Sequence, residues 1–343
     1  MCPVPHRILV IRLSSIGDIV LATPIVRCLR KALPKAKIDF LVKREFLDLV
    51  RFSPHLNHIY AFDKASGPTG LAAIRKEIQR VGYDVIVDIH KNFRSLYVRS
   101  GSGMAKVAVY RKQLLLRALL VLFKLNLYRR PKPAYLRYFE AVEKFGVHYD
   151  GEGTEVFIPK EEIDGIDRLL KTKGYSDSRP LLIVCPGAGF SNKRWLPERF
   201  AAVSAYFLNV KAYAVALLGG SEDREVCEYI RQQVCGDAMN FAGRLRLIQS
   251  AALLQRASVV LANDSGMMHL AQSQKRSVVA VFGPTTEELG YYPIKERSRV
   301  VDVALKCKPC TSKGLHRCPK KHFKCMANIG SDQVIAAIES LSP

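Results

Sequence analysis

Short apolar runs alternate with helical patterns along the chain. The runs are rich in β-branched residues and too short for helices, which is typical of buried parallel strands. They occupy residues 7–13, 37–42, 84–89, 180–185, 215–218, 259–262 and 278–282. Between them, apolar residues recur at three- and four-residue spacing, as at Ile19, Ala22 and Val26, and predict helices. This alternation predicts an α/β fold with doubly wound parallel sheets.

Both halves of the chain open in the same way, with a strand and then a turn that contains glycine or serine. Between them, residues 151–179 are polar and include several glycines and a proline, so we expect the interdomain linker there. A chain of 343 residues is long enough for two domains. We expect domains at residues 1–160 and 161–330, followed by a closing helix within 331–343.

The turns after the strands are the expected ligand sites, because loops at the carboxyl ends of parallel strands line the crevice of such a fold. Asp264, Ser265 and Gly266 follow the strand at 259–262 and precede a predicted helix. Free N–H groups at a helix start attract anions, so we expect a phosphate here, with Thr285 on the next loop as a second wall. The alternative is that Asp264 and Ser265 only cap the helix.

The turn after the first strand places Asp18 at a strand-to-helix junction. A carboxylate there is well placed to take a proton from a hydroxyl, as a general base does; the alternative is a helix cap. Pro24 predicts that the regular helix begins near Thr23. The loop contains the single Gly17 and lacks the G-x-G-x-x-G pattern, so a dinucleotide fingerprint is absent.

Basic and polar residues follow the strand at 84–89 at the same expected edge. Lys91, Asn92 and Arg94 are candidates for binding an anionic acceptor, and a solvated basic loop is the alternative.

In the second half, the loop after residue 185 combines small residues with a lysine. Gly187 and Ala188 would let a phosphate approach the backbone, and Lys193 would neutralise a departing diphosphate. The alternative for Lys193 is a surface lysine. Trp195, the single tryptophan, is expected to anchor the core.

The loop after the strand at 215–218 contains Gly220 and Glu222. Its carboxylate could hold ribose hydroxyls, as acidic residues do in nucleotide-binding folds; helix capping by Ser221 or Asp223 is the alternative for this loop. His269, four residues after Ser265, is either a structural histidine or part of the same site.

Positive charge is concentrated in the first half. The formal net charge is +22, and residues 1–150 contain 27 Lys and Arg against 11 Asp and Glu, which gives +16. Residues 89–139 contain 12 basic residues and no acidic one. This implies an anionic partner: nucleic acid, a phosphorylated lipid surface or a phosphorylated substrate. No run reaches the roughly 18 apolar residues of a membrane span, and Arg12 and Asp18 interrupt the N-terminal apolar stretch, so we expect a cytoplasmic protein.

Residues 111–125 predict a helix in which Gln113, Arg117 and Lys124 form one narrow polar stripe. So thin a polar face is typical of a buried helix. Its flanks are rich in arginine, lysine and tyrosine, which favours contact with an anionic surface there.

Four cysteines within residues 307–325 have spacings that could hold structural zinc. They are Cys307, Cys310, Cys318 and Cys325. Reduced thiols or oxidised pairs are the alternatives.

Several blocks together resemble glycosyltransferase family 9, the ADP-heptose:lipopolysaccharide heptosyltransferases. They read RILVIRLSSIGDIVLATP, PGAGFSNKRWLPERF, LLGGSEDRE, and LANDSGMMHLA with VVAVFGPT. The resemblance implies a GT-B fold, with two Rossmann-like domains facing a central cleft, the first binding the acceptor and the second the donor. It also implies an inverting transfer that needs no metal or other cofactor for catalysis.

By position, the resemblance implies that Asp18 is the general base and that Lys193 stabilises the diphosphate leaving group. The residues expected to bind the donor are Gly187, Ala188, Lys193, Gly220, Glu222, Asp264, Ser265, Gly266, His269 and Thr285. The implied donor is ADP-heptose, and the implied acceptor is the phosphorylated inner core of lipopolysaccharide on lipid A. We expect a monomer that is peripheral on the inner face of the cytoplasmic membrane and binds no nucleic acid.

Other functions fit parts of the sequence. One is a GT-B transferase that uses another nucleotide sugar or a protein acceptor, since some autotransporter-modifying relatives hold iron at a cysteine cluster. Another is a sugar-nucleotide epimerase on the same pair of domains. A nucleic-acid-binding protein would fit the charge and the cysteines, but would leave the loops of Asp18, Lys193 and Asp264 unexplained.

Overall fold

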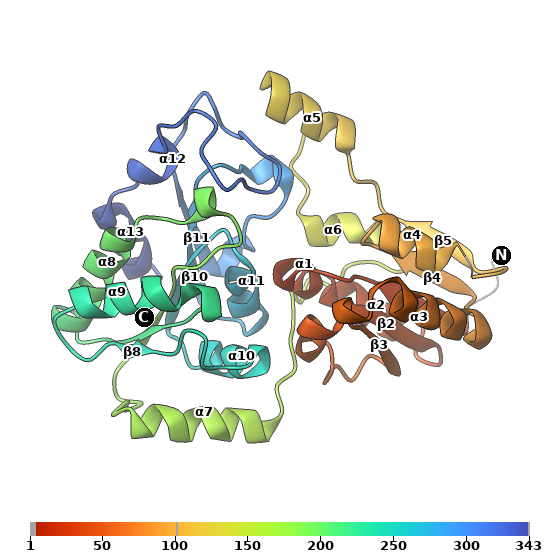
Figure 1. Cartoon of the computed structure of the whole chain (residues 1–343), viewed down its shortest axis with the longest axis horizontal. Helices are drawn as coiled ribbons and strands as arrows, with labels where there is room; N and C mark the ends of the chain where they lie inside the picture. Colours follow the sequence, from red (N-terminus) through yellow and green to blue (C-terminus); the bar gives the residue numbers. More distant parts are fainter. Residues whose placement is uncertain (1–4, 101, 342–343) are drawn as a thin grey trace. The chain divides into compact units, whose positions relative to one another are not determined.

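The computed structural model describes residues 5–100 and 102–341. The chain forms two compact units, one of residues up to 112 with 132–157, the other of 113–131 with 158–343. Each contains one parallel sheet with helices between its strands, so the predicted α/β class is confirmed (Figure 1). The chain passes from the first unit to the second between residues 157 and 158. The boundary expected from the sequence was after residue 160.

The first sheet has the strand order β3-β2-β1-β4-β5, and every pairing is parallel. Its strands are β1 (Arg7–Ile11), β2 (Lys37–Lys43), β3 (His58–Phe62), β4 (Val85–Asp88) and β5 (Lys106–Val109). The helices of this unit are α1 (Ile16–Val20), α2 (Thr23–Ala32), α3 (Gly67–Val81), α4 (Phe93–Arg99) and α6 (Ala134–Phe139). The regular helix α2 begins at Thr23 with Pro24 in its first turn, as predicted.

The second sheet has the strand order β11-β10-β9-β6-β7-β8 and is also parallel. Its strands are β6 (Leu181–Cys185), β7 (Ala214–Leu217), β8 (Met239–Asn240), β9 (Val259–Asn263), β10 (Ser277–Phe282) and β11 (Ser298–Asp302). The helices of this unit are α5 (Leu114–Phe123), α7 (Lys160–Thr172), α8 (Pro197–Asn209), α9 (Arg224–Gln233), α10 (Leu247–Gln255), α11 (Gly266–Ser273), α12 (Lys324–Ala327) and α13 (Ser331–Glu339).

The strand order of each sheet locates its ligand site. The chain winds in one direction from β1 through β2 to β3 and then returns to place β4 on the other side of β1, and β6 lies between β7 and β9 in the same manner. In doubly wound sheets, ligands bind at such a reversal, beyond the carboxyl ends of the two strands. The loops after β1 and β4, and those after β6 and β9, are therefore the candidate ligand-binding loops.

Hydrophobic residues of strands and helices fill both interiors. β1 and β6 are buried almost throughout because each is covered on both faces. Trp195 is buried as predicted, packs against Phe200, and donates its indole N–H to the carbonyl of Ile329 at 3.2 Å. The closing helix α13 contacts α8, β10 and β11 in this core.

The prediction that the helix at 111–125 is buried is wrong. Within α5, whose ten residues are all described, Leu120 is buried, whereas Leu114, Leu115 and Leu122 are 67%, 72% and 71% exposed. The apolar pattern cannot tell a helix in the core from one whose outer face has no protein neighbour, because both are apolar nearly all round.

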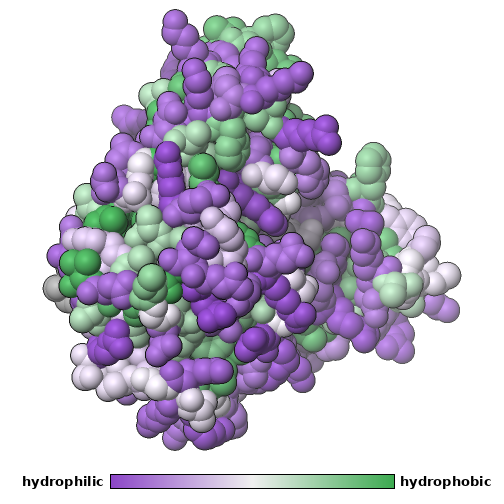
Figure 2. All heavy atoms as spheres, turned by 60° about the vertical axis from the view of Figure 1, so that its left-hand side comes forward, coloured by the Kyte–Doolittle hydropathy of each residue, from purple (hydrophilic) through white to green (hydrophobic). Residues whose placement is uncertain are grey.

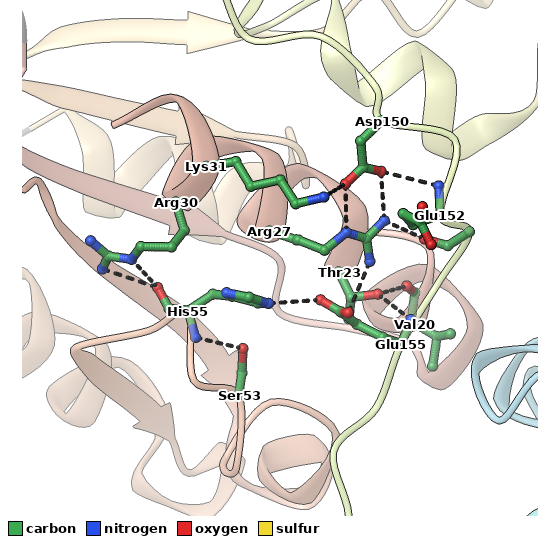
Figure 3. Close-up of polar contacts among 11 residues, drawn as sticks. Val20, Thr23, Arg27, Arg30, Lys31, Ser53, His55, Asp150, Glu152 and Glu155 are labelled. Atoms are coloured by element: carbon green, nitrogen blue, oxygen red, sulfur yellow. Dashed lines mark hydrogen bonds and ion pairs between the residues drawn. The ribbon is translucent and has the colours of Figure 1, made fainter. Parts of the chain in front are cut away.

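The segment that leaves the first unit is fixed to α2 by a network of ion pairs (Figure 3). Arg27 binds both carboxylate oxygens of Asp150 at 2.8 Å, and its third nitrogen lies 2.9 Å from Glu155. Lys31 also contacts Asp150, at 2.7 Å, and His55 contacts Glu155, at 3.2 Å. Because the Arg27 side chain is almost fully buried, both carboxylates are needed to compensate its charge.

Candidate functional sites at two sheet edges

Asp18 lies in the first turn of α1, directly beyond the end of β1. Its Oδ1 contacts Nη2 of Arg12 at 2.5 Å, and its Oδ2 accepts hydrogen bonds from the Ser15 amide and hydroxyl, both at 3.2 Å. The geometry of a helix cap is therefore present. The side chain nevertheless remains 21% exposed, so a substrate hydroxyl can still reach it.

Two opposing effects set the pKa of Asp18. Burial raises it, because a carboxylate loses its water, but the Arg12 charge and the Ser15 hydrogen bonds lower it by more. The net pKa lies below the usual value of an aspartate. Asp18 is thus an ionised hydrogen-bond acceptor at neutral pH, as a general base must be.

Arg12 is a functional residue that the sequence analysis missed. It is buried at the carboxyl end of β1, where its Nε donates to the Ser14 carbonyl at 3.0 Å and its Nη1 to the Ile89 carbonyl at 2.5 Å. It also lies over the Tyr138 ring, 5.3 Å from the centroid. Arg12 thereby links the ends of β1 and β4 and fixes Asp18. An arginine directly after an apolar strand was the available signal.

The loop after β4 and the first turn of α4 contain the three residues predicted to bind an acceptor. Asn92 is the N-cap of α4, where its Oδ1 accepts from the Ser95 amide at 3.0 Å. Lys91 and Arg94 are exposed to solvent. The two basic side chains are therefore accessible to an anion, whereas the Asn92 side chain caps α4.

His90 in the same loop is held neutral. Burial, together with the charge of Arg12, lowers the pKa of His90 to about 3. The His90 Nε2 lies 2.6 Å from the side-chain nitrogen of Asn92, Nδ2. The fully buried Asp88 accepts the backbone N–H groups of His90 and Lys91 at 3.0 and 2.7 Å and so shapes this turn.

In the second unit, one carboxylate joins three loops. The Asp264 Oδ2, beyond β9, lies 2.6 Å from Lys193 Nζ and accepts a hydrogen bond from the Thr285 hydroxyl at the same distance. Asp264 is buried, and its charge is compensated by Lys193. A phosphate would be repelled by Asp264 itself, so we interpret Asp264 as the residue that fixes Lys193 and Thr285 beside the ligand.

The amino end of α11 is a candidate anion site. Ser265 is its N-cap residue, yet its side chain makes no capping hydrogen bond, and its buried Oγ has no partner among the residues described. Gly266 begins the helix, whose first N–H groups lack intrahelical acceptors. An unpaired hydroxyl beside these N–H groups matches the needs of a phosphate oxygen.

Asn263 is a second residue that the sequence analysis missed. It is fully buried at the end of β9, donates from Nδ2 to the Pro186 carbonyl at 2.7 Å, and accepts the Trp195 amide at 3.1 Å. It therefore holds both ends of the loop that contains Lys193. A lone polar residue closing an apolar strand was the only sequence signal for it.

Gly187 must be small because Asp223 lies against it. A Cβ on Gly187 would fall 2.2 Å from the Asp223 carboxylate. Asp223 accepts the Gly220 amide at 3.0 Å, and burial raises its pKa. The predicted ribose ligand, Glu222, is exposed at the end of β7 and therefore available to a ligand. Both Ala188 of the lysine loop and His269 of α11 are buried.

The four cysteines do not fit a metal in the arrangement observed. Among residues 5–100 and 102–341, no three His, Cys, Asp or Glu side chains form a metal-binding group, and all four are free thiols. Burial raises the pKa of Cys310, and that of Cys325 to about 11, so these thiols stay protonated. Cys307 Sγ lies 3.8 Å from His322 Nε2. We therefore assign no chemistry to a metal here.

The cysteine-rich segment instead supports the lysine loop. Leu315 donates its amide to Oδ1 of Asn192 at 2.8 Å and accepts the Asn192 amide at 3.1 Å. A Cβ on Gly314 would fall 2.4 Å from the Phe190 ring, so the two backbones approach closely. The segment thereby pins the residues just before Lys193.

Comparisons with known proteins found relatives of this chain in sequence and in fold. The sequence model of glycosyltransferase family 9 (heptosyltransferase) matches residues 71–321. Lipopolysaccharide heptosyltransferase 2 of Escherichia coli K12 is 25% identical over 311 residues, covering 86% of this chain and 87% of that protein. A solved family 9 glycosyltransferase from Veillonella parvula has a TM-score of 0.82 at 24% identity, covering 98% and 97%. The solved E. coli ADP-heptose lipopolysaccharide heptosyltransferase II has a TM-score of 0.73 at 22% identity, covering 98% of both chains.

Proposed function

Because this chain belongs to glycosyltransferase family 9 and is a glycosyltransferase, we propose that it transfers a heptose from ADP-heptose to the phosphorylated inner core of lipopolysaccharide on lipid A. The names of the E. coli relatives support both the donor and the acceptor. The observation that carries the proposal is the contact of Lys193 and Thr285 with Asp264, beside the unpaired Ser265 hydroxyl at the start of α11.

In the proposed reaction, the diphosphate of the donor binds the N–H groups at the start of α11 and the Ser265 hydroxyl. When the bond between the sugar and the diphosphate breaks, negative charge grows on the leaving ADP. Lys193, held by Asp264, lies at the same loop cluster and stabilises that charge. Glu222 is exposed at the end of β7, where it would accept hydrogen bonds from the ribose.

Asp18 acts on the acceptor. It accepts the proton of the attacking hydroxyl while that oxygen forms the new bond to the anomeric carbon, and ADP leaves from the opposite face with inversion. Its lowered pKa makes Asp18 a weak base, so the proton moves late, as the attacking oxygen becomes acidic during bond formation. Arg12 keeps the carboxylate ionised and correctly oriented.

The proposed acceptor is an anionic glycolipid, which places the enzyme on the inner face of the cytoplasmic membrane. The charge supports this: residues 89–139 contain 12 basic residues and no acidic one. Lys91 and Arg94 are exposed close in sequence to His90, at the edge where Asp18 lies, and would bind phosphate groups of the acceptor.

Calorimetric titration with ADP, UDP and GDP tests the donor. Selective ADP binding, weakened but not abolished in Lys193→Met, is the expected result. A preference for UDP or GDP would retain the transferase and contradict ADP-heptose as the donor.

Transfer by Asp18→Asn tests the mechanism. The amide keeps the size of the side chain but cannot accept the proton, so transfer should fall by a factor of about 10²–10⁴ while ADP affinity stays unchanged. Near-normal turnover in this variant would remove Asp18 from the mechanism.

A further inference from the structure

An apolar surface lies on α5 and the residues after it, although this part of the chain is exposed to water. Its large side chains are 52% to 72% exposed. They are Leu114, Leu115, Leu122, Phe123, Leu125 and Leu127, which we call the α5 surface. Figure 2 shows one face of the molecule, on which hydrophobic atoms lie exposed among hydrophilic ones.

The spacing of these residues makes one face of the helix apolar. Leu114, Ala118 and Leu122 are four residues apart and share a face, and Leu115 lies on it seven residues before Leu122. All four are exposed, whereas Leu120 on the opposite side is buried. A helix that folds against its own protein points its apolar face inward. The outer face of α5 therefore favours an apolar environment, which the described residues of its own unit do not supply.

The helix is fixed to its unit at one end. Lys124 ends α5 and donates to the Pro309 carbonyl at 2.7 Å, and Asn126 donates to Glu288 at 2.8 Å. This anchoring keeps Leu114, Leu115 and Leu122 presented outward.

The charge around the α5 surface is positive. Residues 113–131 contain four basic residues and no acidic one, and among them Arg129 and Arg130 are exposed. The cysteine-rich segment, which Lys124 contacts at Pro309, contains seven basic residues and no acidic one between 303 and 330. The exposed ones are Lys306, Lys313, Arg317, Lys320, Lys321 and Lys324.

We propose that the α5 surface docks the protein on an anionic lipid bilayer, with the exposed leucines and Phe123 in the acyl boundary and Arg129 and Arg130 at the headgroups. An apolar face flanked by basic residues is the pattern of an interfacial helix. Among the described residues, no helix is long and apolar enough to cross a bilayer. Ten residues of helix extend about 15 Å, roughly half of a hydrocarbon core, so α5 lies in the interface.

A bilayer fits this surface better than a second protein. Lysine is depleted in protein interfaces, whereas here lysines and arginines surround the apolar face, and no acidic residue of 113–131 or 303–330 is present to pair with them. The choice of a membrane among anionic partners rests on the proposed function. Because docking is measured without donor or acceptor, the docking proposal and the proposed function can fail separately.

The test is sedimentation of the full chain with vesicles of phosphatidylethanolamine and phosphatidylglycerol, compared with phosphatidylcholine alone. The variant Leu114→Ser/Leu115→Ser/Leu122→Ser should bind the anionic vesicles at least about 100-fold more weakly, because each leucine loses its transfer from water. The matched control is Val210→Ser/Tyr229→Ser, which changes exposed apolar residues elsewhere in the same unit and should bind like the wild type.

A second pair of variants tests the charge. Arg129→Ser/Arg130→Ser should weaken binding to anionic vesicles by about fivefold per charge, since a basic residue near the surface contributes about that factor. Lys171→Ser/Lys173→Ser removes two exposed lysines at the end of α7 and should have a much smaller effect. Added salt should remove the difference between wild type and the arginine variant.

The outcomes are distinct. Loss of vesicle binding in the leucine variant, with unchanged melting temperature and unchanged transfer to a water-soluble deacylated acceptor, supports the proposal. Vesicle binding that the leucine variant retains overturns it, as does a wild type that transfers heptose yet binds no vesicles. A leucine variant that turns from dimer to monomer in analytical ultracentrifugation, with vesicle binding unchanged, would assign the surface to a second copy instead. Vesicle binding without any transfer would overturn the proposed function and leave the docking surface standing.

Discussion

Replacing Arg12 by methionine should move the acid limb of the transfer rate to higher pH. In the wild type, the charge of Arg12 and the hydrogen bonds of Ser15 hold the pKa of Asp18 below its usual value. Asp18 is then ionised above that low pKa, and base catalysis is lost only as the pH falls through it. Without Arg12, burial remains as an effect that raises the pKa, so protonation begins at higher pH.

The 2.5 Å contact between Arg12 and Asp18 sets the magnitude. Two charges whose centres are about 4 Å apart interact by about 4 kcal/mol at an effective dielectric constant of 20, which corresponds to about three pKa units. Part of this is recovered by water at the exposed side of Asp18. An aspartate beside an arginine usually differs by about 1–3 units, and the acid limb should move up by that amount.

The assay is the pH dependence of kcat/KM for transfer, with Arg12→Lys as the control. The lysine variant keeps the charge but loses the fork that binds the Ser14 and Ile89 carbonyls, so its limb should stay close to that of the wild type. If Arg12→Met lowers the rate equally at every pH and leaves the limb in place, Arg12 orients the loop without tuning Asp18. That result would refute the electrostatic reasoning.

Two further predictions concern the other charged clusters. Lys193→Met should lower kcat by a factor of about 10²–10³, because the growing charge on the leaving group loses its cation. Lys193→Arg keeps a positive charge and should recover part of the lost rate. Single-turnover rates with saturating donor measure both variants, and equal rates would contradict the role assigned to Lys193. Arg27→Met should destabilise the first unit by about 3 kcal/mol, since it leaves the Asp150 carboxylate with a weaker partner. Lys31→Met removes an exposed charge from the same carboxylate and should change stability much less than Arg27→Met does, which thermal melts of the two variants compare.

Much of the fold is predictable because most central strands have a local sequence pattern: the seven predicted strands are observed as β1, β2, β4, β6, β7, β9 and β10, whereas β3, β5, β8 and β11 were not predicted. The strands predicted at 37–42, 259–262 and 278–282 differ from the observed β2, β9 and β10 by one residue at most at either end. Their β-branched runs are bounded by turn residues, and a helical pattern between them requires parallel pairing. Apolar runs alone do not specify which strands pair with each other. The reversal of strand order beside each candidate site could therefore not be predicted from them.

The sequence predicted the site residues that lie at the start of a helix. It did not predict the residues whose side chains hold two loops together. Asp18 and Ser265 lie at the start of the helix that comes after a strand, so their place at the sheet edge follows from the pattern. Arg12 and Asn263 act on carbonyls 77 residues away in sequence, and no local pattern encodes such a contact. The exposure of α5 could not be predicted for a related reason, since a pattern that is apolar all round does not say which neighbours a helix has.

The two sheet edges use the same kind of ion pair for opposite purposes. At the first edge, Asp18 is the partly exposed member, and buried Arg12 keeps it negative and ready to accept a proton. At the second, Asp264 is the buried member and holds the Lys193 ammonium in place. Transfer of a sugar needs this polarity, with negative charge where a proton leaves and positive charge where a diphosphate departs. In each pair the buried partner fixes the group that is proposed to react, so removing it should disturb catalysis through the orientation of that group and, for Asp18, also through its pKa.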